Sequence, residues 1–202
     1  MTLWRGKYPL ILASQSRARQ TMLANAGIGF EAIAADIDER AIQHASGLSE
    51  PGEIAAHLAR EKAVSVSLRL SGQYVVGADQ TLALGKRLFS KPAGRAQAAE
   101  QLRALVGHSH ELHSAVAVAR DGEILFAAVA TARMTMRRLG EAEIEAYLSE
   151  AGVAVTSSVG AYQLEGLGVH LFERIEGDHF TILGLPLIQL LGFLRSERLL
   201  GV

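Results

Sequence analysis

The chain has 202 residues, of which 49% are hydrophobic, and it carries a formal net charge of −1. This near-neutral balance gives no support for binding to nucleic acid or to a membrane surface, because both usually show as clustered basic charge. The absence of cysteine excludes disulfides and thiolate chemistry and is compatible with the cytoplasm. Without a signal-peptide pattern or an apolar run of about 20 residues, we expect a soluble, cytoplasmic protein with one domain over residues 1–202.

The predicted elements begin with a buried strand at residues 10–13, which is apolar throughout. A helix is expected from Ser16, with apolar residues at helical spacing as far as Gly27. "FEAIAADIDER" follows as a second strand that runs out into acidic residues, and "PGEIAAHLAREKAVSVSL" as a helix that starts at Pro51. "YVVGAD" is then a short apolar strand that ends in an acid at Asp79.

Two hairpins are predicted in the rest of the chain. One covers residues 81–92 with Gly85 near its turn, and the other covers residues 110–136 around Asp121 and Gly122, a pair that favours a tight type I′ turn. Further helices are expected at residues 93–105, at residues 140–152 and from about Pro186. This alternation predicts an α/β fold with a mixed β-sheet flanked by helices.

Polar side chains gather where apolar segments end, which is where open α/β sheets usually bind ligands. At the first such place, Ser14, Ser16 and Arg19 surround the start of a helix. The free backbone N–H groups there, with the hydroxyls and the guanidinium, could hold phosphate oxygens. Alternatively, Ser16 only caps the helix and Arg19 is solvated. The segment by itself slightly favours this second interpretation.

Three more places could carry chemistry. The acids of "DIDER" could ligate a hard cation such as Mg²⁺. Asp79 in "VVGADQT" could hold a metal or activate water, because burial can tune its protonation. Lys91 of "SKP" is held in an extended segment by the following proline and could reach a phosphate. The alternatives are solvated loop acids, a turn-capping aspartate and a solvent-facing lysine.

Two other motifs point elsewhere. "GHSHELH" brings His108, His110 and His113 close together, and the first two would share one strand face. No Glu lies at an H-E-x-x-H position, so a polar strand edge is favoured over a metal site. The glycines at residues 166–168 fit neither the dinucleotide-binding G-x-G-x-x-G pattern nor the Walker A pattern.

Taken together, these segments resemble the Maf family of nucleoside triphosphate pyrophosphatases over nearly the whole chain. "LASQSRARQTML" corresponds to the family's L-A-S-x-S-P-R-R-x-x-L-L opening and "DIDE" to its acidic D-x-D-E segment. "LAREKA", "GADQT", "SKP", "GHSHELHSAVAV" and "ILGLPLIQLL" follow in the family's order. Seven segments in register make the resemblance specific.

The resemblance implies a hydrolase acting on acid anhydrides, with two lobes around a nucleotide-binding cleft. It would cleave a nucleoside triphosphate between the α and β phosphates with a divalent cation, Mg²⁺ or Mn²⁺, and form a homodimer. Asp79 would be the catalytic proton acceptor, and Glu39 and Asp79 would lie at the metal. The phosphate ligands carried over from the family are Ser14, Ser16, Arg19, Lys62 and Lys91.

The chain departs from the family at Arg17, where the family has proline, and at Ala18, where it has the first of two arginines. In the family that this chain resembles, members that prefer dTTP and UTP carry Arg, Thr and Gln at the positions held here by Ala18, Gln80 and Glu165. The 7-methyl-GTP branch resembles this chain in "DQ" and "EGLG…LFERI". A carboxylate suits the adjacent donors of guanine, which favours a guanine-type nucleotide, modified ones included.

Three alternatives stay open from the sequence. The chain could prefer dTTP and UTP, it could be a nucleotide-binding regulator of cell division with little turnover, or it could be a metalloprotein built on the histidine cluster. The presence of Lys62, Asp79 and Lys91 favours turnover.

Overall fold

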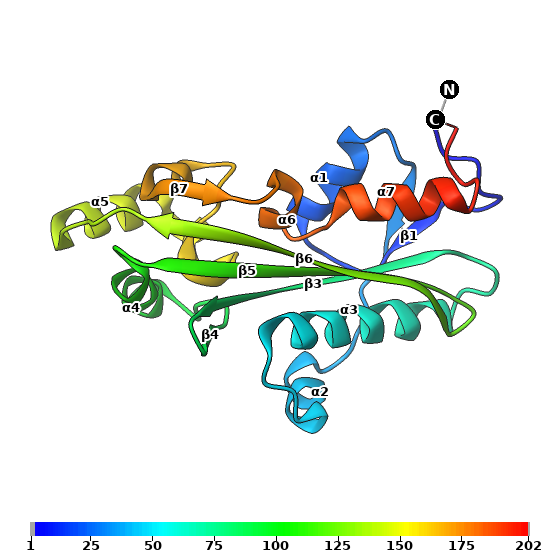
Figure 1. The fold of residues 1–202 in the computed structure, drawn as a ribbon, viewed down its shortest axis with the longest axis horizontal. Coiled ribbons are helices and arrows are strands. Elements are labelled where there is room, and N and C mark those ends of the chain that lie inside the picture. Colours follow the sequence, from blue (N-terminus) through cyan, green and yellow to red (C-terminus); the bar gives the residue numbers. More distant parts are fainter. Residues whose placement is uncertain (1–2, 202) are drawn as a thin grey trace. The chain divides into compact units, whose positions relative to one another are not determined.

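The computed structural model describes residues 3–201 and confirms an α/β fold with a mixed sheet flanked by helices (Figure 1). Its seven strands follow the order β2-β1-β3-β5-β6-β7, with β4 paired to β3. The strands are β1 Leu10–Leu12, β2 Phe30–Ala32, β3 Val75–Leu84, β4 Arg87–Phe89, β5 Ser109–Arg120, β6 Glu123–Met136 and β7 Phe172–Glu176. The helices are α1 Arg17–Asn25, α2 Glu39–Ser46, α3 Pro51–Ser67, α4 Arg95–Leu105, α5 Glu141–Ala151, α6 His179–Ile182 and α7 Leu187–Ser196, with 3₁₀ turns η1 Gly152–Thr156, η2 Val159–Ala161 and η3 Leu167–Leu171.

The described residues form two compact units. The first contains the chain up to Gln80, then His113–Ala130, and the chain from His179 onward. The second contains Thr81–Leu112 and Thr131–Asp178. Across residues 3–201, no helix combines the length and the apolar character that spanning a membrane requires.

Parallel pairing sets the polar edge of the first unit. Strand β1 pairs in parallel with β2 and with β3, so that Leu12 lies opposite Ala32 and Val76. Parallel neighbours need crossover connections, which α1 supplies between β1 and β2, and α2 with α3 between β2 and β3. Because parallel strands run the same way, Ser14 after β1 and the part of β3 beyond Val76 lie toward the same edge.

The two faces of the sheet in the first unit are covered by different helices. Leu10 and Leu12 of β1 belong to one buried cluster with residues of α1 and α7, whereas Ile11 and Ala13 pack on the other face with Val66 of α3. Figure 1 shows α1 and α7 on one side of these strands and α3 on the other. Successive side chains of a strand point to opposite faces, which explains why β1 is apolar throughout.

The helix α3 approaches β3 closely because both surfaces carry small residues. A Cβ added to Gly77 would lie 2.1 Å from the Ala59 carbonyl oxygen and 2.6 Å from the Ala63 backbone nitrogen. Only glycine allows two backbones to come this near each other. Consequently, α3 lies directly against the amino-terminal half of β3, around Gly77.

Several local predictions are confirmed. Asp121 and Gly122 have φ of 51° and 84°, and the positive sign at both positions is the signature of the type I′ turn that their sequence predicts. The hairpin around Gly85 forms between β3 and β4, with a φ of 59° at that glycine. The last helix begins at Leu187, directly after Pro186.

The predicted extent of the second strand was wrong. Strand β2 ends at Ala32, and the acidic segment after it leads into a helix. The Asp38 carboxylate accepts a hydrogen bond from the Ala41 backbone N–H at 3.0 Å, so this acid caps the start of α2. The sequence patterns predicted neither the short helix α2 nor the strand β7.

Candidate active site

The core of the candidate site is a buried ion pair at Asp79, in the middle of β3. Asp79 is 7% exposed, and its Oδ1 lies 2.7 Å from Nζ of Lys62, which is also 7% exposed and comes from α3. The same ammonium lies 2.9 Å from Oε1 of Glu39 at the start of α2. Three residues that the sequence singled out separately therefore meet around a single nitrogen atom.

Burial raises the pKa of Asp79, and the positive charges of Lys62 and Arg19 oppose that rise. A carboxylate with a raised pKa is a stronger base than an exposed one, provided that it is ionised. The contact with Lys62 favours the ionised form. The geometry therefore suits Asp79 to accepting a proton from a water molecule.

The serine-rich corner after β1 is a helix cap with additional contacts. Ser16 is the N-cap of α1 and accepts a hydrogen bond from the Arg19 backbone N–H at 3.5 Å. Ser14 is buried, and its Oγ accepts from the Ser16 backbone N–H at 3.2 Å. The capping alternative is thus correct for Ser16, and the Ser14 hydroxyl lies beside the start of the same helix.

Arg19 is not solvated, so that part of the alternative was wrong. Its Nε donates to the Gly184 carbonyl at 2.7 Å, and its Nη1 donates to the Ala78 carbonyl at 2.8 Å and to Ser14 Oγ at 3.2 Å. Burial lowers the pKa of Arg19, while Asp79 and Glu39 act in the opposite direction. Within residues 3–201, Nη2 is the guanidinium nitrogen with no hydrogen bond to the protein.

The residues considered for base selectivity lie in different surroundings. Ala18 is half-buried on the first turn of α1, and Arg17 beside it is exposed. Gln80 follows Asp79 on β3, and its Nε2 donates to Ser114 Oγ and to two backbone carbonyls. Glu165 belongs to the second unit, where it is exposed on a turn before η3.

The turn that carries Glu165 explains the glycines after it. The Gly166 N–H donates to the Gln163 carbonyl at 3.2 Å, and a Cβ on Gly168 would lie 2.4 Å from that same carbonyl oxygen. The glycine at position 168 therefore allows a tight turn. This local role agrees with the sequence, in which these glycines match no nucleotide-binding pattern. Lys91, also in the second unit, is exposed next to the buried Pro92.

The histidine cluster does not form a metal site. His110 is 1% exposed, and its Nε2 lies 2.7 Å from the Tyr162 hydroxyl. His108 is exposed and precedes β5, which begins at Ser109, and its Nδ1 lies 2.9 Å from the Val106 carbonyl oxygen. Among the residues that the structure describes, no three His, Cys, Asp or Glu side chains are grouped to hold a metal ion.

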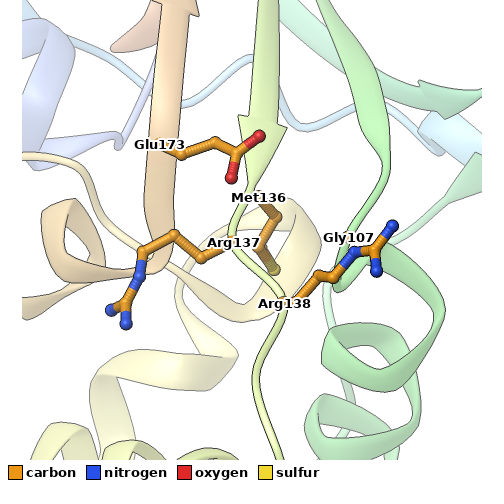
Figure 2. Close-up of a pocket in the computed structure, with 5 residues that line it drawn as sticks. All are labelled: Gly107, Met136, Arg137, Arg138 and Glu173. Carbon is orange, nitrogen blue, oxygen red and sulfur yellow. The ribbon is translucent and has the colours of Figure 1, made fainter.

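A pocket of about 450 Å³ in the second unit contains none of the predicted site residues. Figure 2 shows that the guanidinium groups of Arg137 and Arg138 point away from each other. Arg137 also donates to the His170 carbonyl at 2.9 Å. The pocket is lined by Gly107, Met136, Arg137, Arg138 and Glu173.

The pair of carboxylates around Lys62 is the donor set in the first unit that suits a hard cation. Glu39 and Asp79 both reach the same ammonium, so their oxygens converge on one point. The Glu39 side chain is 51% exposed, which leaves room for water on that side. Mg²⁺ is usually bound by one or two carboxylates together with water and substrate phosphates, and the arrangement fits that pattern.

The family model described as Maf-like protein matches residues 9–197. The chain belongs to the Maf-like protein family. A protein from Bradyrhizobium diazoefficiens named nucleoside triphosphate pyrophosphatase is 70% identical over 202 residues, which is 100% of both chains. A Rhodopseudomonas palustris protein with the same name is 71% identical over 202 residues, again 100% of both.

More distant matches are also found for this Maf-like chain. A Rhizobium meliloti protein named 7-methyl-GTP pyrophosphatase is 50% identical over 190 residues, covering 93% of this chain and 95% of that protein. Among solved structures, a HAM1 protein from Coxiella burnetii has a TM-score of 0.42 and 19% identity, over 65% of this chain and 74% of that one.

Proposed function

We propose that this Maf-like chain is a nucleoside triphosphate pyrophosphatase, which hydrolyses the bond between the α and β phosphates to give a nucleoside monophosphate and pyrophosphate. The observation that carries the proposal is the buried Asp79 carboxylate, 2.7 Å from Lys62 and on the sheet edge that also holds Ser14 and Arg19. The names of relatives that are 70% and 71% identical over the full chain support it.

In the proposed reaction, Asp79 accepts a proton from the attacking water. The water oxygen bonds to the α phosphorus while the bond from that phosphorus to the bridging oxygen breaks, and the bridging oxygen leaves with pyrophosphate. The phosphate oxygens would be held by Lys62, by Ser14 and by the free Nη2 of Arg19. Positioning and charge neutralisation of this kind supply most of the catalysis in phosphoryl transfer.

Ser16 and Lys91 complete the proposed set of phosphate ligands. Ser16 would contribute through the helix start that it caps and through its own O–H, since its Oγ acts only as an acceptor toward the Arg19 N–H. The exposed ammonium of Lys91 would add positive charge.

We propose that Glu39 and Asp79 hold a divalent cation, Mg²⁺ or Mn²⁺. When bound, such a cation would neutralise charge on the phosphate oxygens. Lys62, whose ammonium now contacts both carboxylates, would then donate its N–H groups to the phosphate oxygens.

The single domain, the homodimer and the cytoplasmic location stay predictions.

For the base, we propose a preference for guanine-type nucleotides, with modified ones included. The Glu165 carboxylate could accept from the adjacent N1–H and N2–H₂ donors of guanine, and the small Ala18 leaves space for a larger base. The relative named 7-methyl-GTP pyrophosphatase, at 50% identity, supports this choice over dTTP and UTP.

A nucleotide panel tests the reaction. Purified protein would be incubated with GTP, 7-methyl-GTP, UTP and dTTP, with Mg²⁺ or Mn²⁺, and pyrophosphate and monophosphate would be measured. We expect both products in equal amounts, with the guanine-type nucleotides fastest. Nucleotide binding without pyrophosphate from any of them would overturn the proposed activity and favour a regulator.

The base preference is tested separately with Glu165→Gln, since an amide presents both a donor and an acceptor. We expect a shift in ranking away from guanine-type nucleotides, whereas Glu150→Gln on an exposed part of α5 should leave the ranking as it is. If the ranking with Glu165→Gln is unchanged, the base assignment fails and the pyrophosphatase activity does not.

A further inference from the structure

The side-chain amide of Gln80 is engaged by the protein itself. Its Nε2 donates to Ser114 Oγ at 2.8 Å, to the Ile182 carbonyl at 3.0 Å and to the Thr181 carbonyl at 3.1 Å. Ser114 Oγ in turn donates to the Thr181 carbonyl at 2.6 Å. Two amide hydrogens thus serve three acceptors, and turning the amide over would place its oxygen against those same acceptors. The surroundings therefore determine which way the amide points.

Arg19 holds the same segment from α1. Its Nε donates to the Gly184 carbonyl, while its Nη1 donates to the Ala78 carbonyl on β3. Gly184 has a φ of +93°, which favours glycine, and a Cβ there would lie 3.4 Å from the Arg19 guanidinium and 3.7 Å from the amide carbon of Gln80. Residues 181–184 are therefore tied to β3 through two side chains that come from separate elements.

These contacts lie on the face of β3 opposite the catalytic carboxylate. Val76 and Ala78 belong to the buried cluster that includes α1 and α7, whereas Val75 packs with α3. By the alternation of a strand, Gln80 shares the face of Ala78, and Asp79 shares the face on which Lys62 lies. Hydrogen bonds therefore form on both faces of the sheet at this point, from Lys62 to the Asp79 carboxylate and from Gln80 to Ser114 and residues 181–182.

We propose that Gln80, Ser114 and Arg19 form a latch that fixes residues 181–184 to β3 and thereby positions Asp79 for the reaction. On this view Gln80 is a positioning residue and not a reader of the nucleotide base. The kinetic part of this inference rests on the proposed pyrophosphatase activity. A carboxylate that deprotonates water must be held accurately, because a displacement of about 1 Å costs about 10²-fold in rate.

The test compares Ser114→Ala with a matched variant, Ser67→Ala. Ser67 is 1% exposed, donates to the Val64 carbonyl and accepts from the Gly122 N–H, so it is likewise a buried hydroxyl with two hydrogen bonds in the first unit. Gln80→Leu removes the amide at similar volume. For each variant, kcat, KM, the ranking of nucleotides and the melting temperature would be measured.

We expect Gln80→Leu and Ser114→Ala to lower kcat by about ten- to a hundredfold, with KM and the nucleotide ranking unchanged. Ser67→Ala should lower the melting temperature comparably and leave kcat unchanged. Equal kcat for Ser114→Ala and Ser67→Ala would overturn the latch. A changed ranking in Gln80→Leu, with kcat kept for the best nucleotide, would instead make Gln80 a base reader and also overturn it.

A second measurement separates failure of the latch from failure of the proposed function. The amides of Leu183, Gly184 and Leu185 donate to carbonyls within the α6 turn, so their hydrogen exchange reports on the tied segment. We expect faster exchange at these amides in Gln80→Leu and in Ser114→Ala, and no change in Ser67→Ala. Unchanged exchange overturns the latch even if pyrophosphate is released, and faster exchange supports the latch even if no nucleotide is hydrolysed.

Discussion

The first unit buries a charged pair, Lys62 with Asp79, whereas the second unit buries a neutral pair, His110 with Tyr162, and both pairs are joined at 2.7 Å. Burial raises the pKa of Asp79, with Lys62 opposing the rise. In the other pair, burial lowers the pKa of His110 from 6.5 to about 4, so its ring is neutral at pH 7. Keeping charge in a buried place is costly, and such charge is more often retained for function than neutral polarity is.

The two pairs also differ in the side chains that surround them. The ammonium of Lys62 also reaches the half-exposed Glu39, so the buried charged pair is linked to a side chain at the surface. His110 is packed against Tyr162 and Phe172, and its Nδ1 has no hydrogen-bond partner in the described structure. The comparison indicates that the neutral pair belongs to the core, and the following variants test that distinction.

The largest effect is expected from Asp79→Asn. Loss of the proton acceptor should lower pyrophosphate release by about 10²- to 10⁴-fold, the usual contribution of a general base. Asp121→Asn, at the exposed turn between β5 and β6, is the matched control and should keep the wild-type rate. Near-normal turnover of Asp79→Asn would remove the charged pair from the reaction.

The next largest effect is expected on stability, from Lys62→Met. Asp79 would keep a buried charge without its partner, which typically costs about 3–5 kcal/mol. Urea denaturation would measure the free energy of unfolding. The double variant Lys62→Met with Asp79→Leu should recover most of the loss, because it removes both charges. A double variant as unstable as the single one would contradict this account of the pair.

A smaller loss is expected from Gly77→Ala, which tests the close approach that brings Lys62 to Asp79. The new methyl group would meet the Ala59 carbonyl, so α3 must move away from β3. Overpacking of this kind costs about 1–3 kcal/mol, and we expect turnover to fall as well. Gly192→Ala on α7 is the control, since a Cβ there meets nothing within 4 Å. Wild-type turnover in Gly77→Ala would show that the approach is not needed.

The smallest effect at neutral pH is expected when both members of the neutral pair are replaced, in His110→Phe with Tyr162→Phe. Removing both polar partners together is often nearly neutral, so stability at pH 7 should change by less than about 1 kcal/mol and turnover should persist. Loss of turnover without loss of stability would contradict the structural role of this pair.

The same double variant also tests a pH dependence. In the wild type, the unfolded chain protonates His110 near 6.5, whereas the folded chain does so only near 4. Stability should therefore fall as the pH drops through this window, by up to about 3 kcal/mol from this group. Chemical denaturation between pH 7 and pH 4 should show a shallower loss in the double variant. Parallel curves for the two proteins would contradict the shifted pKa.

Much of the local structure could be predicted from the sequence because the signals are short-range. The apolar run at Leu10, the glycine after Asp121 and Pro186 before the last helix each act within a few residues. Predictions failed where one residue type serves two purposes. Asp38 looks like a metal-binding acid at a strand end, but its carboxylate caps α2.

The candidate site was predictable as a set of residues but not as an arrangement. Asp79, Lys62 and Glu39 were each identified by a segment of their own, and nothing in those segments says that one ammonium joins them. Ser114 and Gly184 were missed, because a serine inside an apolar strand and a glycine before a proline-containing turn carry no distinctive pattern.

The sequence by itself determined most of the strands and helices, where the polar edge lies and which family the chain resembles, because all of these follow from neighbouring residues and short motifs. The tertiary structure alone decided what the polar side chains do. Gln80 donates to a carbonyl 101 residues further along the chain, and Arg19 to one 165 residues away. Such partners are chosen by strand alternation and by the packing of helices on opposite faces of the sheet, which no local pattern encodes.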